Sequence, residues 1–456
     1  MTGFSIGTFS VFHNFAFPLD FEVDFSKMDF RKLSTNSEVK TILISSLNAS
    51  TAILKNNNYL EGSTGYGDCV EEYFSTARRL FSPHYFSAQR NIRLFLVGPK
   101  LLDMRGKKRN VDVNALLDKR GILIINFHIA YDTDGISTVE LIEELHNPYH
   151  NATLYITSEE GKEIAMDLKQ AAKYYYEKIA SLLDREVVSP KNKALVLSKV
   201  ELQNYIEPYA LTVINMHSGK TEHESLGSQI ENEALKILLW DYRRIDEFNT
   251  AGIEKFYEEI SQKRKQVAFF SAESTLMINN GEKPCIENAD VIYTLINIEI
   301  LLMQKVVLQL YDRVIDKDLN ELRQKRVSPN TILSIRNDVL RDLEEFFDVR
   351  TKLYQRGREI SDVGKKVLNL TEYYNEIHRK IDTLDDLIKL RHTLYLESLT
   401  LLLTSVSLIV IITFSVAQFV GSFYQNWVFL AGVLSLTIVF GLFYASVRSM
   451  MQHKSD

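Results

Sequence analysis

Two apolar runs near the C-terminus constrain this chain more than any other feature of its sequence. Residues 399–420 and 427–447 contain no charged side chain. A helix rises about 1.5 Å per residue, so each run is long enough to cross a hydrocarbon core of about 30 Å. We therefore predict two transmembrane helices joined by the short outer loop 421–426. The alternative is a buried helical hairpin, which would have to hide more apolar length than a domain of this size normally does.

The charges beside these runs predict their orientation. Lys389, Arg391 and His392 precede the first run, Arg448 and Lys454 follow the second, and the loop between them has no basic residue. Basic residues concentrate on the cytoplasmic side of membrane proteins. We therefore expect a multi-pass protein of the inner (plasma) membrane with both termini in the cytoplasm, the last nine residues, 448–456, forming a cytoplasmic tail.

A long helical pattern leads into the first run. It begins after Pro329, with Asn330 as a capping residue, and continues without proline to residue 397, roughly 100 Å at the helical rise. Its apolar residues step alternately by three and four, as in a coiled coil: Ile360, Val363, Val367, Leu370, Tyr374, Ile377, Ile381, Leu384 and Ile388. Residues 287–326 form a shorter helical stretch, expected to pack against the long helix as an antiparallel hairpin. Because it cannot cover the whole seam, we expect self-association; the alternative is a long helix folded entirely on its own domain.

Residues 1–285 mix strand and helix patterns, which predicts an α/β or α+β cytosolic body. Strands are expected at 19–25 and in runs beginning at Thr41, Ile92, Gly121, Ala152, Tyr209 and Gln266, and helices over about 68–82, 158–184 and 227–263. The predicted organisation is thus a body (1–285), a helical stalk (286–397, with the heptad helix at 330–397) and a membrane part (398–447).

Composition excludes several classes of protein. The net charge of the 456 residues is −6 with the two signs interspersed, which argues against a nucleic-acid partner. Cys69 and Cys285 are the only cysteines, so neither a disulfide framework nor a thiolate zinc site is expected.

Two glycine-containing segments of the body are weak candidates for ligand binding. Gly219, Lys220 and Thr221 resemble the end of a phosphate-binding loop, but Ile214 stands where the leading glycine belongs, so a polar turn is favoured. Gly62, Gly65 and Gly67 precede a predicted helix and can present amides to an anion; a plain surface loop is the alternative.

One pair of histidines has a spacing that could suit a metal site. His146 and His150 lie four residues apart, but Asn147 and Pro148 are expected to prevent a regular helix between them, so we do not expect a shared metal. The metal ligands of the chain are therefore unknown, and no catalytic residues are predicted. We expect no enzymatic activity.

The layout of a mixed body, a proline-punctuated hairpin, a helix of roughly 100 Å, two C-terminal spans and a short basic tail resembles the CorA family of divalent-cation channels. The family has a Gly-Met-Asn triplet at the outer end of the first span. Here the same place holds Gly421, Ser422, Phe423, Tyr424, Gln425 and Asn426, without the triplet. The resemblance implies an oligomer, five subunits in the family, with Gly421, Tyr424, Gln425 and Asn426 at the outer mouth of a pore. The missing triplet puts magnesium selectivity in doubt.

Some CorA-like proteins without the triplet are membrane effectors of type III CRISPR antiviral systems, which implies a nucleotide second messenger as ligand of the cytosolic body. We therefore expect a homo-oligomeric membrane channel or effector gated by that body. One alternative is a transporter of Mg²⁺ or Co²⁺ with an atypical mouth. The other is a membrane-tethered enzyme or scaffold whose spans only anchor it. No cofactor is assigned beyond the nucleotide or divalent cation that these readings imply.

The first apolar run carries one polar stripe. Its members fall within about 80° of one another at about 100° per residue: Glu397, Thr400, Thr404, Ser407, Ile411, Ser415, Gln418 and Ser422. As a pore lining, the stripe would place a carboxylate ring at Glu397 and an apolar constriction at Ile411. The alternative is close packing of membrane helices, where Ser and Thr are common, and Ser405 and Thr413 do lie off the stripe.

Overall fold

The computed structural model divides the chain into two compact units. The first comprises residues 1–310 and 342–373, and the second comprises 311–341 and 374–456. The residues that the structure describes are 6–19, 21–27, 91–157, 162–183, 188–190, 207–216, 233–240, 257–259, 266–279, 289–323 and 355–421, with a few positions in 336–340 and 432–441.

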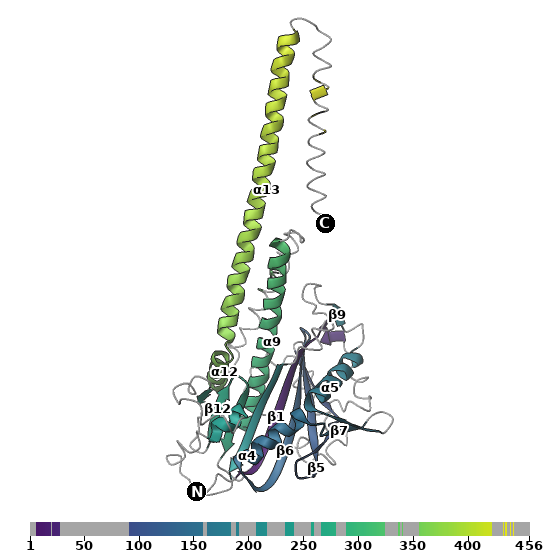
Figure 1. Cartoon of the computed structure of the whole chain (residues 1–456), viewed down its shortest axis with the longest axis vertical. Coiled ribbons are helices and arrows are strands. Elements are labelled where there is room, and N and C mark those ends of the chain that lie inside the picture. The colour runs from purple at the N-terminus through teal and green to yellow at the C-terminus, as the bar shows by residue number, and fades with distance from the viewer. Residues whose placement is uncertain are drawn as a thin grey trace. The chain divides into compact units, whose positions relative to one another are not determined.

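The first unit is built on an 11-stranded mixed sheet (Figure 1). Its main path runs β11-β12-β13-β10-β1-β6-β5-β4-β7-β8, and β3 pairs with β5. Among the strands that the structure describes, only β10 and β13 pair in parallel. The strands are β1 (Ile6–Pro18), β3 (Asn91–Leu96), β4 (Lys100–Leu102), β5 (Lys108–Asp118), β6 (Ile122–Ile136), β7 (Leu154–Thr157), β8 (Glu163–Met166), β10 (Glu207–Met216), β11 (Tyr257–Glu259), β12 (Gln266–Ser271) and β13 (Ser274–Asn279). Strands β2 (Phe21–Val23) and β9 (Val188–Pro190) form a separate pair.

The strands predicted near residues 92, 121, 152 and 209 are confirmed as β3, β6, β7 and β10. The run beginning at Gln266 is a hairpin of two strands rather than one, because Ser271 accepts a hydrogen bond from the backbone N–H of Ser274 and closes a tight turn. The strand expected at 19–25 is only the three-residue β2. Strand β1, at the centre of the sheet, was not predicted. The predicted strand from Thr41 and helix 68–82 lie outside the described residues.

Two of the predicted helices differ from the structure. Helix α5 (Leu168–Leu182) begins ten residues later than expected, because 163–166 form strand β8 and Asp167 caps the helix. In the range 227–263 the described residues are helical only at 233–239, and 257–259 belong to β11.

Helix α4 (Thr138–His150) was not predicted, and it corrects the expectation that Pro148 prevents a regular helix between His146 and His150. Pro148 lies inside α4, two residues before its end, where its missing N–H removes one helical hydrogen bond. The two imidazole rings stack with centroids 5.5 Å apart. Among the described residues, no group of three His, Cys, Asp or Glu side chains is placed to hold a metal ion.

The two faces of the sheet are covered by different helices (Figure 1). Neighbouring residues of a strand point to opposite faces. His13 of β1 contacts Tyr149 of α4, and on the same face Phe127 contacts Tyr175 of α5. This face carries the main apolar core. Because both faces of the sheet are covered, β1 has ten successive buried residues among its thirteen. The strand therefore lacks the alternation of apolar and polar residues by which a half-buried strand is recognised in a sequence.

The opposite face carries a row of polar side chains across four strands. Asn14, Asn126 and Asn114 are register partners, and their amides form a chain: Asn114 donates to Asn126 (3.2 Å), Asn126 to Asn14 (2.7 Å), and Asn14 to the carbonyl of Tyr209 (3.3 Å). Arg93 of β3 donates to Asn114 and pairs through both guanidinium nitrogens with Glu299.

Glu299 belongs to α9 (Ala289–Arg323), so the polar row ends on that helix. Both charged side chains are almost fully buried. A buried charge is tolerated only with a well-placed partner, and this pair therefore specifies how α9 lies on the sheet. Helix α12 (Gln355–Val367) also packs here, where a Cβ on Gly364 would come within 2.3 Å of Leu301 Cδ1.

The second unit contains the end of α9 and most of α13 (Leu370–Gly421). Lys380 of α13 pairs with Asp312 (2.6 Å) and Asp316 (2.9 Å) of α9. Burial lowers the pKa of Lys380, but these hydrogen bonds outweigh burial and raise it. The apolar seam of α13 is buried at Ile377, Ile381 and Leu384.

The helices of the expected stalk differ from the prediction in one way. The expected continuous helix is broken, because Asn369 adopts a left-handed conformation (φ 54°) between α12 and α13. Asparagine tolerates that conformation better than most residues. Leu301 lies against Gly364 in the first unit, and Asp312 pairs with Lys380 in the second. The antiparallel packing of the two predicted helices stays a prediction.

Candidate functional site

Helix α13 carries the sequence-predicted pore stripe. All seven stripe residues from Glu397 to Gln418 are exposed in this chain, and Ile411 keeps 61% of its surface. Gly421 is the last residue of α13. Ser422 and the outer-loop residues Tyr424, Gln425 and Asn426 lie outside the described residues.

Five hydroxyl groups in the apolar run of α13 donate to backbone carbonyls of the same helix. On the stripe, Thr400, Thr404 and Ser415 each donate to the carbonyl four residues earlier at 2.7–2.9 Å. Off the stripe, Ser405 and Thr413 do the same. Such bonds remove the cost of an unpaired donor both in lipid and in a packed interface. The two sets of hydroxyls therefore differ only in the face of the helix on which they lie.

The same part of α13 exposes a large apolar surface. Leu401, Leu408, Ile412, Phe414 and Val416 each keep more than half of their surface uncovered. The segment Leu370–Val416 is long and apolar enough to cross a membrane, with a mean hydropathy of 2.4 in its most apolar window, of which nothing is buried inside the chain.

A second helix of the described chain passes the same test of length and composition. It is the segment Tyr293–Lys317 of α9, but 89% of its apolar window is buried inside the protein. The sequence predicted residues 427–447 as the second span. Of these, 432, 434, 435, 438 and 441 are described, and all five are helical.

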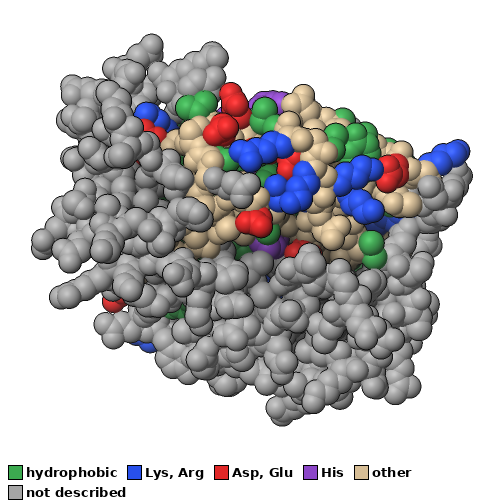
Figure 2. Space-filling view, turned by 90° about the horizontal axis from the view of Figure 1, so that it is seen from below, with side chains coloured by type: hydrophobic (Ala, Val, Ile, Leu, Met, Phe, Trp, Pro, Cys, Tyr) green, Lys and Arg blue, Asp and Glu red, His purple; other side chains and the backbone are tan. Residues whose placement is uncertain are grey.

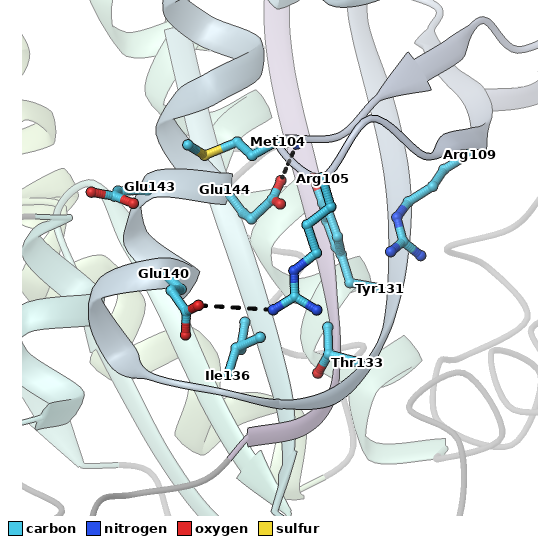
Figure 3. Close-up of a pocket in the computed structure, with 9 residues that line it drawn as sticks. All are labelled: Met104, Arg105, Arg109, Tyr131, Thr133, Ile136, Glu140, Glu143 and Glu144. Atoms are coloured by element: carbon cyan, nitrogen blue, oxygen red, sulfur yellow. Dashed lines mark hydrogen bonds and ion pairs between the residues drawn. The ribbon is translucent and has the colours of Figure 1, made fainter.

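The weak ligand-binding candidates of the sequence are not brought into a described site. Gly62, Gly65 and Gly67 lie outside the described residues, as do Gly219, Lys220 and Thr221. The structure instead offers a cavity of about 150 Å³ in the first unit (Figure 3). It lies between the turn that joins β4 to β5, the end of β6 and the first turns of α4.

Local sequence explains how these elements are fixed. Ser137 accepts a hydrogen bond from the N–H of Glu140, and the Glu140 carboxylate accepts one from the N–H of Ser137, a capping box that starts α4 beside the cavity. These bonds with Ser137 lower the pKa of Glu140. In the β4–β5 turn, Asp103 accepts hydrogen bonds from the N–H groups of Arg105 (3.1 Å) and Lys107 (2.7 Å), and Gly106 takes the left-handed conformation that the turn needs (φ 79°).

Arg109 and Tyr131 form a rigid wall of the cavity. The Nε of Arg109 donates to Asp103 at 2.7 Å, and its guanidinium lies over the ring of Tyr131. Phe9 stacks on the same ring at 4.3 Å. Burial raises the pKa of Tyr131, so its hydroxyl stays protonated and can act as a hydrogen-bond donor.

Glu144 is the buried acid of the cavity. Only 8% of its surface is exposed, and its carboxylate accepts a hydrogen bond from the N–H of Met104 at 3.5 Å, the outer limit for such a bond. Burial raises the pKa of Glu144, an effect that the Met104 bond partly offsets. No motif marks this cavity in the sequence, because its residues come from three separate segments.

Comparison with known proteins adds no relative. No protein-family model matches the chain, and a search of curated proteins finds no match.

Proposed function

We propose that this protein is a homo-oligomeric, CorA-like membrane channel in which copies of α13 surround a pore and ligand binding to the cytosolic body controls it. One observation carries the proposal. Helix α13 contains a segment, Leu370–Val416, that is long and apolar enough to cross a bilayer, and its most apolar window is not covered by the chain itself. Leaving such a surface in water is unfavourable by about 25 cal/mol per Å². Lipid and neighbouring copies are the natural cover.

The stripe on α13 supports a pore rather than a simple anchor. A polar face on a membrane helix serves either a pore or a packed interface between helices, and a lone anchor uses neither. Here Glu397, Thr404, Ser407, Ile411 and Gln418 share one exposed face, and the apolar side chains Leu401, Ile409 and Ile412 lie outside it. In a ring of copies this face would supply a carboxylate ring and hydroxyl groups for cations and, at Ile411, an apolar gate.

The body supports control by a ligand. Helix α9 is fixed to the sheet by Arg93 and Glu299, and its last turns pair with α13 through Lys380. Gating requires two conformations of the body that differ in the position of α9 on the sheet. A ligand with a higher affinity for one of these conformations increases the population of that conformation.

The test is ion flux through the purified full-length protein in planar bilayers. Ile411→Ala should raise the open probability, because it removes the apolar constriction. Ile409→Ala is the matched control, since it makes the same change about 160° away on the same helix and should leave the current as in the wild type. Bilayers that hold folded oligomer yet stay ion-tight for both variants would refute the channel.

Labelling provides a second, independent readout. In a background with Cys69 and Cys285 replaced by Ser, a charged thiol reagent should modify Cys introduced at Ile411 and leave Cys introduced at Ile409 unmodified. Equal protection of both positions would support the anchor alternative. Uptake of radioactive Mg²⁺ or Co²⁺ into vesicles separates a transporter from a ligand-gated effector.

A further inference from the structure

The cavity of the first unit has a charge imbalance that its own residues do not correct. Glu140, Glu143 and Glu144 line it from α4, and Arg105 and Arg109 from the β4–β5 turn and β5. Arg109 is already neutralised by Asp103, which leaves Arg105 with the carboxylates of Glu140 and Glu144, whereas the Glu143 carboxylate points away from it (Figure 3). Figure 2 shows acidic and basic side chains of the described residues interspersed on one face of the molecule.

Arg105 is the movable member of the group. Its guanidinium lies in the middle of the cavity (Figure 3), yet its ion pair is with Glu140 at 3.9 Å, and both side chains are about half exposed. Exposed pairs of this kind contribute little stability. The backbone that carries Arg105 is held by Asp103, so the side chain can swing out while the turn stays in place.

Among the described residues, the carboxylate at the inner end of the cavity has one weak hydrogen-bond partner. Glu144 has 8% of its surface exposed and only the long hydrogen bond from the Met104 N–H. A buried carboxylate gains most from a charge-assisted donor. The hydroxyl of Tyr131 is a further polar group on this wall. Together these groups suit a nitrogen cation with several N–H donors better than an anion.

We propose that this cavity binds a small organic cation with a guanidinium or primary amine group, and that Arg105 occupies the site as an internal competitor when the ligand is absent. The cation contacts Glu144 at the inner end and Glu140 at the mouth, and it displaces the Arg105 side chain. That this cation is also the ligand that gates the channel rests on the proposed function. Binding itself does not.

The probe is agmatine, which carries both a guanidinium and an amine, titrated by calorimetry into the full-length protein in lipid nanodiscs. Wild-type protein should bind it, and Arg105→Ala should bind it about twofold to fivefold more tightly because the weak internal ion pair no longer competes. Glu144→Gln should bind at least about tenfold more weakly, because a charge-assisted hydrogen bond is lost without a change of shape.

The matched control is Glu163→Gln. Glu163 lies outside the cavity on β8 and pairs with Lys108 at 3.6 Å, so its loss removes an acid of the same unit without touching the site. Agmatine affinity should stay at the wild-type value. If Glu144→Gln does not fold, as judged by its thermal unfolding, the increase expected for Arg105→Ala still decides the matter.

Two results would overturn the inference. One is an agmatine affinity that is the same in wild type, Arg105→Ala and Glu144→Gln, including no binding by any of them. The other is binding of inorganic phosphate that Arg105→Ala abolishes, which would make the site anionic in its preference. Agmatine binding without any change in bilayer current would support the site and count against gating, whereas current without agmatine binding would support the channel and refute the site.

Discussion

Helices α9 and α13 are both apolar and long enough to cross a membrane, but they differ in how much of their apolar surface the protein buries. Of the most apolar window of α9, 89% is buried inside the chain, whereas nothing of the corresponding window of α13 is. Hydropathy therefore selects both helices, and only the tertiary structure separates them. The helix that packs into the sheet fills the core of a folded unit, and the helix left uncovered needs another environment.

The polar side chains of the two helices also differ in where their hydrogen-bond partners come from. Helix α9 carries a full charge, Glu299, into the core and needs Arg93 from a distant strand to tolerate it. It also buries Asn297, which donates to its own helix at Tyr293. Between residues 399 and 420, α13 carries no charge, and its hydroxyls donate to its own backbone. A helix can thus carry polar side chains inside a protein if other segments supply their hydrogen-bond partners. Where no other segment does so, the side chains bond to the backbone of their own helix.

The largest effect should come from breaking the charged contact of α9. Arg93→Met leaves the Glu299 carboxylate buried without its partner, and the free energy of unfolding should fall by about 3–5 kcal/mol. Denaturation of the full chain in detergent measures it. Combining Arg93→Met with Glu299→Leu should recover most of the loss. A single variant as stable as the wild type would show that α9 does not depend on this pair.

A charge placed in α13 should act on membrane insertion instead. Leu408→Lys puts an ammonium in the middle of the uncovered apolar segment, and insertion should become less favourable by about 2.5–3.5 kcal/mol. The membrane-bound fraction after alkaline extraction measures it. Leu390→Lys, on the same helix but before the apolar run and next to Lys389, should insert as the wild type does. Equal membrane fractions for all three proteins would argue that α13 does not cross a bilayer.

The stability of the first unit should depend on pH through a buried histidine. Burial lowers the pKa of His13 to about 3. The folded state therefore binds fewer protons than the unfolded state, in which the histidine titrates near 6.5, and stability is lost as the pH falls below that value, by about 2 kcal/mol at pH 5. His13→Asn should reduce this loss.

Trp240 is a suitable local reporter of this change. Its ring lies 5.9 Å from that of His13, and the chain has one other tryptophan, Trp427. In a Trp427→Phe background, unfolding followed by Trp240 fluorescence at pH 7 and pH 5 should show the difference between wild-type and His13→Asn proteins. The same loss at pH 5 in both would assign the pH dependence to other groups.

The smallest effect should come from the glycine at the contact between α12 and α9. Gly364→Ala gains about 1 kcal/mol of helix propensity, but its Cβ requires the end of the Leu301 side chain to move. The gain in helix propensity and the cost of moving Leu301 oppose each other. The free energy of unfolding, measured by thermal denaturation, should therefore change by less than about 1 kcal/mol. Gly364→Leu should cost about 1–3 kcal/mol through overpacking. A tolerated leucine would mean that α12 is not packed closely on α9.

Several features of the fold were predictable because they are local. Strands β3, β6, β7 and β10 are apolar runs bounded by polar turns, and α9 and α13 have long helical patterns. The hairpin of β12 and β13 was missed because a single serine side chain makes its turn, and β1 because both of its faces are buried. The break at Asn369 was hidden by a heptad pattern that continues across it.

The α/β body and a helix apolar enough to cross a membrane could be predicted from the sequence, because periodicity and apolar length are properties of neighbouring residues. The burial of α9 in a core, and the cavity shared by Arg105, Tyr131 and Glu144, follow from the folded structure. Those relations depend on the register of strands and on partners far apart in the chain, such as Arg93 and Glu299. No local pattern records such pairings.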